Sequence, residues 1–359
     1  MKRFPGRLAV QQRVLPGYRA PFFDLLASAC DGGMSLFTGS PRPGEGITTA
    51  KQLQIANYRL GKNLHFFSGP FYLCYQLGLL NWLQHWNPDA LIVEANPRYL
   101  STPSAIRWMH ERKRPVIGWG LGSPPVCELR KQRRASFIHQ FDAMIAYSQR
   151  GADEYATLGF PREKIFIAHN SVSAPPSFVP DHRLLTIDRF TILFVGRLQA
   201  RKRIDSLLRA CAQLNSRPRL VIVGDGPERD ALQVLAKEIY PGAEFIGAKH
   251  GEELKPYFLE ADLFVLPGTG GLAVQEAMSY GLPVIVAQGD GTQDDLVRKE
   301  NGWQVPPGDF DALVAVMKDA LSDVARLRKM GEESYRIVKE EINIEKMVET
   351  FVTVLNSLR

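Results

Sequence analysis

The chain has 359 residues, of which 45% are hydrophobic and 23% are charged. This length and composition exclude an intrinsically disordered chain and suit two globular domains of ordinary size. The net charge of +6 is unevenly distributed, because residues 1–180 carry 21 Lys/Arg against 11 Asp/Glu and residues 181–359 carry 23 against 27. The basic first half predicts an anionic partner such as lipid headgroups, phosphates or nucleic acid.

The cysteines and histidines indicate neither a disulfide framework nor a metal site. The four cysteines lie far apart without a CxxC pair, which is typical of a reducing compartment; they are Cys30, Cys74, Cys127 and Cys211. The seven histidines are scattered, without an HxxH, HxH or DxD pattern, so we predict no metal and no cofactor. The N-terminal segment MKRFPGRLAV lacks the apolar stretch of a signal peptide, and the expected location is the cytoplasm.

Short apolar segments alternate with longer helical patterns through the first half, which is typical of parallel sheets built from β/α units. The expected strands are Leu8–Gln11, Leu36–Phe37, Ala90–Glu94, Pro115–Trp119, Ala143–Tyr147 and Ile165–Ala168. Helices are expected to begin near Tyr18, Ser101 and Gly151. Residues 171–188 carry three prolines among their first ten residues and predict a linker.

The segment Phe66–Trp86 is rich in aromatic residues, but glycine, proline and polar residues interrupt it. A transmembrane span is therefore disfavoured against a buried helix or a membrane-facing surface. Basic clusters at residues 112–114 and 130–134 are ordinarily solvated faces. Together with the aromatic segment, however, they predict peripheral binding to an anionic bilayer, at the inner face of the membrane.

The strand and helix rhythm restarts after the linker. The expected strands are Thr191–Val195, Leu220–Val223, Glu244–Ile246, Leu263–Leu266 and Pro283–Val286. From Asp309 onward the pattern is helical, with a break at Glu341–Ile344. We therefore predict an α/β protein with two doubly wound domains, residues 1–175 and 189–340, that face a cleft, and a helix at 341–359 that crosses back to the first domain.

Two segments of the second half combine a strand end with phosphate-binding residue types. In the first, FVGRLQARKR, Gly196 frees the backbone to turn, and Arg197 and Lys202 could converge on a diphosphate, although a solvated basic turn is an equal alternative. In the second, LFVLPGTGGLAVQEAM, the amides of Thr269–Leu272 precede a helix that carries Glu276. This glutamate could accept hydrogen bonds from ribose hydroxyls, or it could be an ordinary surface residue.

Two further acidic sites have simpler explanations. The turn VGDGP places Asp225 directly after a strand, and a tight turn without ligand contact explains it best. Asp294 and Asp295 follow a glycine-rich loop and are expected to cap the N-terminus of a helix.

The segments GRL-x-x-x-K, VGDGP, EAM-x-x-G-x-PVI and NGW-x-VPPGD resemble, in this order, the retaining glycosyltransferases of family 4. The resemblance spans about 120 residues and is weak for residues 1–180. It implies the GT-B fold, in which two Rossmann-like domains face a cleft, and hexosyl transfer from a nucleotide-diphosphate sugar. The acceptor would be a glycan, a lipid-linked or a small molecule, as in polysaccharide biosynthesis.

The resemblance also implies roles for individual residues. Arg197 and Lys202 match the pair that neutralises the donor diphosphate, Glu276 matches the glutamate that binds the donor ribose, and Gly247 matches the backbone position that meets the nucleobase. The chain departs from the family at Gly268, where the family has its first glutamate. Either the backbone amides of Gly270 and Gly271 hold the donor sugar in its place, or the donor sugar differs from that of the family.

In the first half, candidate site residues follow three of the expected strands. The loop VLPGYR offers Gly17 for close approach to the donor phosphates and Tyr18 and Arg19 for the acceptor side, with a structural turn as an equal alternative. Trp119 and His169 stand at two other strand ends and are further acceptor-side candidates, although a lone histidine is more often structural.

The sequence favours a metal-independent, retaining glycosyltransferase. A nucleotide-sugar epimerase or hydrolase on the same fold, or a non-catalytic nucleotide-sugar binder, is the alternative, and the absent first glutamate motivates the latter. Nucleic-acid binding is disfavoured, because no recognition motif accompanies the basic residues.

Overall fold

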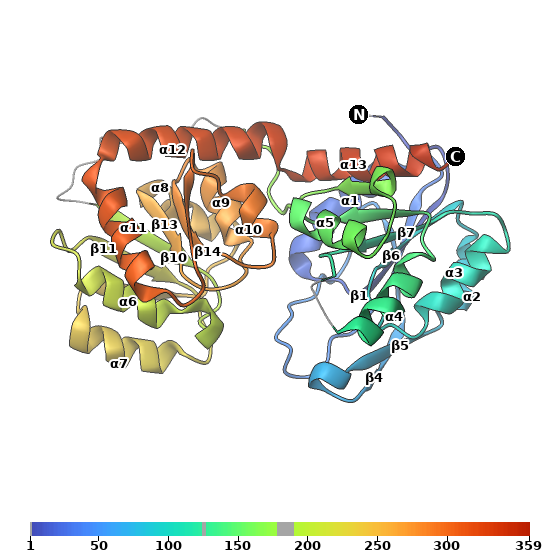
Figure 1. Ribbon diagram of the computed structural model, residues 1–359, viewed down its shortest axis with the longest axis horizontal. Helices are drawn as coiled ribbons and strands as arrows, with labels where there is room; N and C mark the ends of the chain where they lie inside the picture. The colour runs from blue at the N-terminus through green and yellow to red at the C-terminus, as the bar shows by residue number, and fades with distance from the viewer. Residues whose placement is uncertain (1, 124–126, 178–189) are drawn as a thin grey trace. The chain divides into compact units, whose positions relative to one another are not determined.

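The computed structural model describes residues 2–123, 127–177 and 190–359 (Figure 1). The chain divides into two compact units, unit 1 with Met1–Val172 and Ile344–Arg359, and unit 2 with Ser173–Asn343. Residues 178–188 of the expected linker lie outside the described residues. The same holds for Pro124 and Pro125, which follow the glycine-rich stretch after Trp119.

Unit 1 contains a parallel sheet of seven strands in the order β3-β2-β1-β6-β7-β8-β9. The strands are β1 (Leu8–Val14), β2 (Met34–Gly39), β3 (Asn57–Leu60), β6 (Ala90–Glu94), β7 (Val116–Gly120), β8 (Ala143–Ala146) and β9 (Ile165–Ile167). The strand order reverses between β1 and β6, and such a reversal is where open α/β sheets bind ligands.

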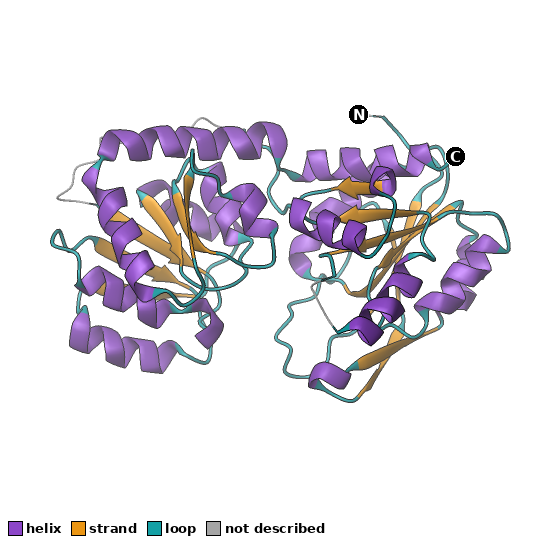
Figure 2. Ribbon diagram, viewed as in Figure 1, coloured by secondary structure: helices purple, strands orange, loops and turns teal. Residues whose placement is uncertain are grey.

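Helices cover both faces of this sheet (Figure 2). They are α1 (Ala20–Ser28), α2 (Leu79–Trp86), α3 (Thr102–His110), α4 (Glu128–Ile138), α5 (Gln149–Thr157) and α13 (Ile344–Ser357), with short turns η1 (Gly17–Arg19), η2 (Gly69–Phe71) and η3 (Arg162–Lys164). Because strand side chains alternate, Leu8 and Val10 pack in one core cluster with α1 and α13, while Ala9 packs in another with α2, α3 and α5. The last helix of the chain therefore completes the core of unit 1.

A two-stranded antiparallel ribbon, β4 (Lys62–Phe66) and β5 (Leu73–Leu77), stands apart from the main sheet of unit 1. The segment Phe66–Trp86, expected to be a buried helix or a membrane-facing surface, divides into two parts. Its first half forms the end of β4, η2 and β5, and its second half forms α2. The indoles of α2 belong to the interior, since Trp82 Nε1 donates to Ser35 Oγ at 2.9 Å and Trp86 Nε1 donates to the Leu8 carbonyl at 3.0 Å.

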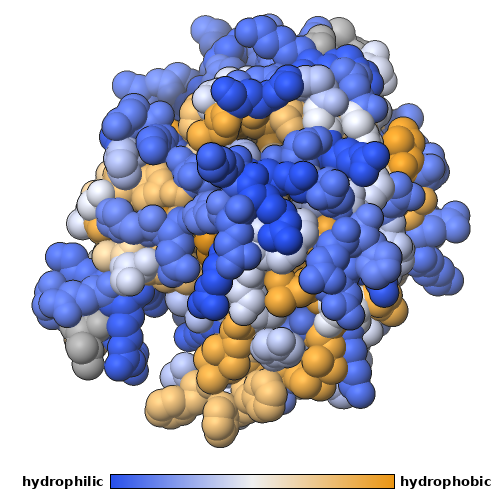
Figure 3. Space-filling view, turned by 90° about the vertical axis from the view of Figure 1, so that its right-hand side faces the viewer, coloured by the Kyte–Doolittle hydropathy of each residue, from blue (hydrophilic) through white to orange (hydrophobic). Residues whose placement is uncertain are grey.

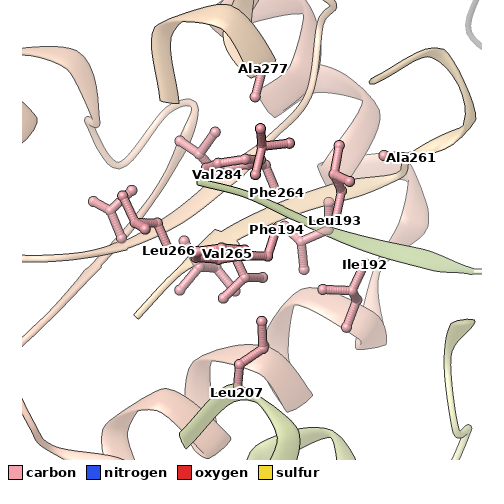
Figure 4. Close-up of a cluster of buried hydrophobic side chains, with 14 of the residues drawn as sticks. Ile192, Leu193, Phe194, Leu207, Ala261, Phe264, Val265, Leu266, Ala277 and Val284 are labelled. Carbon is pink, nitrogen blue, oxygen red and sulfur yellow. The ribbon is translucent and has the colours of Figure 1, made fainter. Parts of the chain in front are cut away.

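Unit 2 contains a parallel sheet of six strands in the order β12-β11-β10-β13-β14-β15. The strands are β10 (Thr191–Val195), β11 (Arg219–Val223), β12 (Ala243–Gly247), β13 (Leu263–Leu266), β14 (Val284–Ala287) and β15 (Gly302–Val305). Their apolar side chains form one continuous core, part of which Figure 4 shows around Phe194, Phe264 and Val284. The order reverses between β10 and β13, as in the dinucleotide-binding folds.

The helices of unit 2 follow its strands in alternation. They are α6 (Ile204–Ala212), α7 (Arg229–Ile239), α8 (Lys255–Glu260), α9 (Ala273–Ser279), α10 (Thr292–Leu296), α11 (Phe310–Ser322) and α12 (Val324–Arg336), with 3₁₀ turns η5 (Ala200–Lys202) and η6 (Gly251–Leu254) and a π-helical turn η7 (Ile337–Glu341). Among the described residues, no helix combines the length and the apolarity needed to cross a bilayer.

The predicted fold class is confirmed, since both sheets are parallel and doubly wound, and all eleven expected strands are strands within a few residues of their predicted bounds. The sequence analysis missed β3, the ribbon β4–β5 and β15. The capping role of Asp294 and Asp295 was also wrong, because Gly291 occupies the N-cap of α10 and both aspartates lie in its first turn. Asp290 accepts the Thr292 amide at 3.1 Å instead.

Candidate functional site

The loops that follow β10 and β13 meet at the reversal point of the unit 2 sheet. The loop after β10 contains Gly196, Arg197 and, in η5, Lys202, and the loop after β13 runs from Pro267 to Leu272. The Thr269 amide donates to the Arg201 carbonyl at 3.1 Å, so the two loops are joined through their backbones. This junction contains the residues that the sequence predicted for the donor diphosphate.

Lys202 is a buried lysine, with only 5% of its surface exposed. Its ammonium group donates to the carbonyls of Thr269, at 2.9 Å, and of Gly270. Arg201 donates to the same Thr269 carbonyl at 3.1 Å. Burial, with a smaller contribution from the charge of Arg201, lowers the pKa of Lys202 to about 8. An anion that approached this ammonium group would gain more than it would at a solvated lysine, because less water screens the interaction.

Gly268 lies directly against the backbone of η5. A Cβ atom at this position would stand 2.2 Å from the Arg201 carbonyl oxygen and 2.5 Å from Lys202 Cα. Neither atom can move without displacing the turn that carries Lys202. The position of the family's first glutamate therefore has no room for a side chain in this chain.

The structure also explains why the two residues after Thr269 are glycines. Gly270 has a φ of +67° and Gly271 a φ of +152°, in the region that favours glycine. A Cβ atom on Gly271 would stand 2.6 Å from Leu266 Cδ2 and 3.6 Å from Lys202 Nζ. The absence of side chains here keeps the backbone of the loop close to the buried ammonium group.

The VGDGP turn supports the first loop from the neighbouring strand, β11. A Cβ atom on Gly224 would stand 1.9 Å from the Gly196 carbonyl oxygen, and one on Gly226 would stand 2.2 Å from the Leu198 carbonyl oxygen. The Leu198 amide donates to the Asp225 carbonyl at 2.9 Å. Both glycines thus permit the close backbone contact that positions the segment carrying Arg197, whose side chain is exposed.

Glu276 lies in α9, the helix that follows the glycine loop. Its side chain is half-buried, and its carboxylate makes no hydrogen bond or ion pair with the described residues. Burial raises the pKa of this carboxyl group. A half-buried carboxylate without partners is suited to hydrogen bonds from ligand hydroxyls. The structure does not pair Glu276 with Lys202, and Gly247, at the end of β12, lies two strands away from β10.

In unit 1, the loop after β1 is part of the folded framework. The Gly17 amide donates to the Thr48 carbonyl at 2.9 Å, and Tyr18 is 49% exposed. Arg19 is buried, with its guanidinium 5.1 Å from the ring centre of Trp119 and 5.4 Å from that of Tyr147. Its Nη1 lies 3.8 Å from the sulfur of Met347 in α13, so this arginine joins the first loop to the last helix.

An open pocket of about 340 Å³ lies at the carboxyl ends of β6, β7 and β8, and its lining includes Glu94, Tyr99, Trp119, Tyr147 and Tyr155. The Glu94 carboxylate accepts the Arg13 amide at 3.2 Å, and burial raises its pKa. The buried indole nitrogen of Trp119 has no hydrogen-bond partner among the described residues. Aromatic rings, one carboxyl group and an unused donor form a suitable lining for a sugar-like ligand.

Of the acceptor-side candidates, Trp119 lines this pocket and His169 does not. His169 follows β9 at the edge of the sheet, where its carbonyl accepts the Ser171 hydroxyl at 3.2 Å. The sequence analysis missed Glu94, although it predicted the strand that ends there. A carboxylate that closes an apolar strand was the available signal.

Within the described residues, no three His, Cys, Asp or Glu side chains gather as they would around a metal ion.

Residues 182–337 match the family model of the glycosyl transferases group 1. This match covers less than half of the 359 residues, so the family pattern is a finding about the second half of the chain. A GDP-mannose-dependent alpha-mannosyltransferase of Mycobacterium tuberculosis is 40% identical over 121 residues, 33% of this chain and 30% of that protein. The lipopolysaccharide core biosynthesis glycosyltransferase LpsE of Rhizobium meliloti is 24% identical over 228 residues, 62% of this chain and 67% of that protein. The chain spans between 30% and 45% of the length of three of its curated relatives.

The fold resemblance extends over both units. The crystal structure of Anabaena Alr3699/HepE in complex with UDP has a TM-score of 0.74 to this chain, at 16% identity, over 99% of this chain and 100% of that chain. The two parallel sheets are therefore those of the GT-B fold, as the resemblance of the second half implied.

Proposed function

We propose that the chain is a glycosyltransferase of the group 1 family, which transfers a hexosyl group from a nucleotide-diphosphate sugar to a hydroxyl group of an acceptor, with retention of configuration. The observation that carries the proposal is the buried ammonium of Lys202, held against the glycine loop at the reversal point of the unit 2 sheet. A lysine with a pKa near 8 is costly to keep in a folded protein, and an anionic ligand offsets that cost.

In the proposed reaction, the bond between the anomeric carbon and the diphosphate oxygen breaks, and its electron pair goes to the diphosphate. A bond from the anomeric carbon to the acceptor oxygen forms, and the proton of the acceptor hydroxyl group passes to the departing diphosphate. Negative charge develops on the departing diphosphate. Lys202 from within the protein and Arg197 from its surface would stabilise that charge without a metal ion, and such preorganised charge is commonly the largest contribution to catalysis. Gly196 supports the proposal by allowing the turn that presents Arg197.

The other parts of the donor are assigned to residues around the proposed diphosphate position. We assign the donor sugar to the backbone of Thr269–Leu272, the ribose hydroxyls to Glu276 and the nucleobase to the neighbourhood of Gly247. Two comparisons support a nucleotide-diphosphate donor, since the mannosyltransferase relative is named as GDP-mannose-dependent and the Anabaena protein was crystallised with UDP. Gly17 is assigned to the face that approaches the donor phosphates.

The acceptor is assigned to unit 1, so that residues 1–175 form the acceptor domain, residues 189–340 the donor domain, and residues 341–359 the returning helix. The pocket at Glu94 and Trp119 supports this assignment, because its rings can stack on a sugar and its carboxyl group can orient a hydroxyl. Tyr18 and His169 remain acceptor-side candidates. The name of the Rhizobium relative supports a glycan or lipid-linked glycan as acceptor.

We also propose that the enzyme acts in the cytoplasm, in peripheral contact with the anionic inner face of a membrane. The excess of Lys and Arg in residues 1–180 supports this, since each basic residue near an anionic surface contributes about 1 kcal/mol.

The test combines ligand binding with turnover. A panel of nucleotide sugars is screened by thermal shift, because a ligand at a hundred times its Kd stabilises a protein by about 2.7 kcal/mol. With the donor identified, Arg197→Ala and Lys202→Ala should each lower kcat/KM at least tenfold, or about 1.4 kcal/mol. Lys237→Ala removes an exposed lysine in the last turn of α7 and serves as the control. Near-normal rates in both site variants would refute the assignment.

The rivals are a nucleotide-sugar epimerase or hydrolase and a non-catalytic nucleotide-sugar binder. The occupied space at Gly268 favours the binder, because the family's first glutamate has no counterpart there. The fate of the donor distinguishes transfer, hydrolysis and binding without turnover. A glycosylated acceptor in a membrane extract supports transfer, free sugar independent of acceptor indicates hydrolysis, and tight binding without turnover indicates a binder.

A further inference from the structure

We propose that the ribbon β4–η2–β5, residues 62–77, inserts its outer face into the surface of an anionic membrane. This inference rests on the proposed peripheral membrane contact and identifies the element that makes it. It replaces the basic cluster at 112–114 as the main membrane-binding site.

The polarity of the ribbon is inverted relative to that of an ordinary surface ribbon. The pairs Asn63–Gln76 and His65–Cys74 alternate along the ribbon with the pairs Leu64–Tyr75 and Phe66–Leu73. Alternation places these two sets on opposite faces.

The polar face is the one that packs on unit 1. Asn63 Nδ2 donates to the carbonyls of Arg13 at 2.8 Å and Ser40 at 2.9 Å, and Gln76 Nε2 donates to the Gln12 carbonyl at 3.1 Å. These bonds orient the ribbon firmly, so that its apolar face must point away from the protein. Ordinary folding would reverse this pattern, because burial favours the apolar side chains.

The outward face and the tip of the ribbon are strongly exposed. Phe66 is 42% exposed, Tyr75 39% and Leu77 42%, while Phe67 and Phe71, which flank the Gly69–Pro70 turn, are 72% and 73% exposed. Apolar side chains gather along the lower edge of the face in Figure 3, at the level of the ribbon in Figure 1. Aromatic residues on a projecting tip are typical of proteins that anchor at the membrane interface.

The charges around the ribbon fit a lipid surface better than a protein partner. The sequence has no acidic residue between Glu45 and Asp89, whereas Lys51, Arg59 and Lys62 in this stretch are all exposed. Glu45 itself is neutralised, since Arg13 lies 2.9 Å and Arg42 3.0 Å from its carboxylate. Exposed apolar side chains in a stretch whose charged residues are all cations match the acyl boundary and the anionic headgroups of a bilayer.

The basic cluster at 112–114 is already engaged within unit 1. Arg112 stacks on Trp108 with its guanidinium 4.0 Å from the ring centre, and Arg114 donates to Asn87 Oδ1 at 2.6 Å. These contacts engage two of the three cations of the cluster, so fewer of its charges are available to contact lipid headgroups.

The experiment uses the full chain and flotation with two kinds of vesicle, phosphatidylcholine alone and phosphatidylcholine mixed with phosphatidylglycerol. We expect the wild type to float with the mixed vesicles and Phe67→Ser/Phe71→Ser to bind them at least about tenfold more weakly. The control Val234→Ser/Leu259→Ser removes two exposed apolar residues of unit 2, 67% and 40% exposed, and should bind like the wild type. Thermal unfolding of each variant checks that the fold is intact.

A second measurement reports insertion directly. Brominated lipid should quench the tryptophan fluorescence of Phe71→Trp more strongly than that of Val234→Trp, and this result would support insertion of the tip. Equal flotation of the serine variant and the wild type would overturn the ribbon inference, and so would a ribbon-dependent dimer that binds no vesicles. If the wild type binds neither vesicle but still binds and turns over the nucleotide sugar, the membrane contact fails while the proposed transfer stands.

Discussion

Both units contain a doubly wound sheet whose strand order reverses beside its first strand. The sites at their strand ends differ, because one consists mainly of backbone atoms and the other mainly of side chains. In unit 2 the loops touch through backbone atoms, with Gly224, Gly226 and Gly268 each placed where a Cβ atom would collide with a neighbouring backbone. In unit 1 the strand ends contribute side chains, and the pocket is lined by rings and by Glu94. The unit 2 site is thus a backbone framework around one buried cation, and the unit 1 pocket is a side-chain surface.

This difference explains why one half of the chain was easier to interpret. A backbone contact of about 2 Å to a virtual Cβ admits glycine alone, so it appears in the sequence as a glycine at a fixed place. A pocket wall admits many combinations of aromatic and polar side chains. The unit 2 site therefore carries a recognisable sequence pattern, and the unit 1 pocket does not.

The largest expected effect tests the backbone framework. Gly268→Ala should destabilise unit 2 by about 3 kcal/mol, because the new methyl group meets immobile backbone atoms of Arg201 and Lys202. Urea unfolding followed by circular dichroism measures this. Gly242→Ala is the matched control, since a Cβ atom at Gly242 has nothing within 4 Å. Equal stability of the two variants would contradict the framework.

The next effect tests the side-chain pocket. Glu94→Gln keeps the size of the residue but removes its carboxyl group, and we expect transfer to fall about tenfold or more while the Kd of the nucleotide sugar stays unchanged. Isothermal titration with the donor and rates at varied acceptor concentration separate the two steps. A weaker donor complex with normal acceptor kinetics would move Glu94 out of the acceptor site.

The pH dependence of donor binding tests the buried cation. The pKa of Lys202 is lowered to about 8 in the free protein, so the group is charged below that pH and loses its proton as the pH rises through it. A bound diphosphate favours the charged form, and donor affinity should therefore be highest below pH 8 and fall up to about tenfold per pH unit above it. Titrations of the nucleotide sugar identified by thermal shift, from about pH 6 to about pH 9.5, measure the trend. Lys202→Ala should show weak binding without this decline.

The smallest expected effect concerns a glycine of unit 1. A Cβ atom on Gly17 would stand 3.6 Å from the Thr48 carbonyl oxygen, which is ordinary contact, and Gly17 has no positive φ. Gly17→Ala should therefore change the free energy of unfolding of the ligand-free protein by less than about 0.5 kcal/mol. Differential scanning calorimetry provides the comparison with Gly268→Ala, and a large loss of stability would remove the contrast between the two units.

Most of the sheet strands could be predicted from the sequence, because buried parallel strands are short apolar runs between turn residues. The elements that were missed lack this signal. β3 (Asn57–Leu60) is mostly exposed, and in the ribbon β4–β5 the polar side chains pack inward. β15 (Gly302–Val305) begins with Gly302, where a Cβ atom would stand 2.1 Å from the Val284 carbonyl oxygen, and a glycine in the sequence looks like a turn.

The candidate site was predictable in part for the same reason. The sequence alone located the glycine loop, Arg197, Lys202 and Glu276, since close backbone approach and charge at a strand end leave traces in residue type and spacing. Only the tertiary structure decided that Lys202 is buried against Thr269, that Gly268 excludes any side chain, and that Glu94 shares a pocket with Trp119. These facts depend on distances between residues from different strands, and local sequence does not encode which strand ends become neighbours.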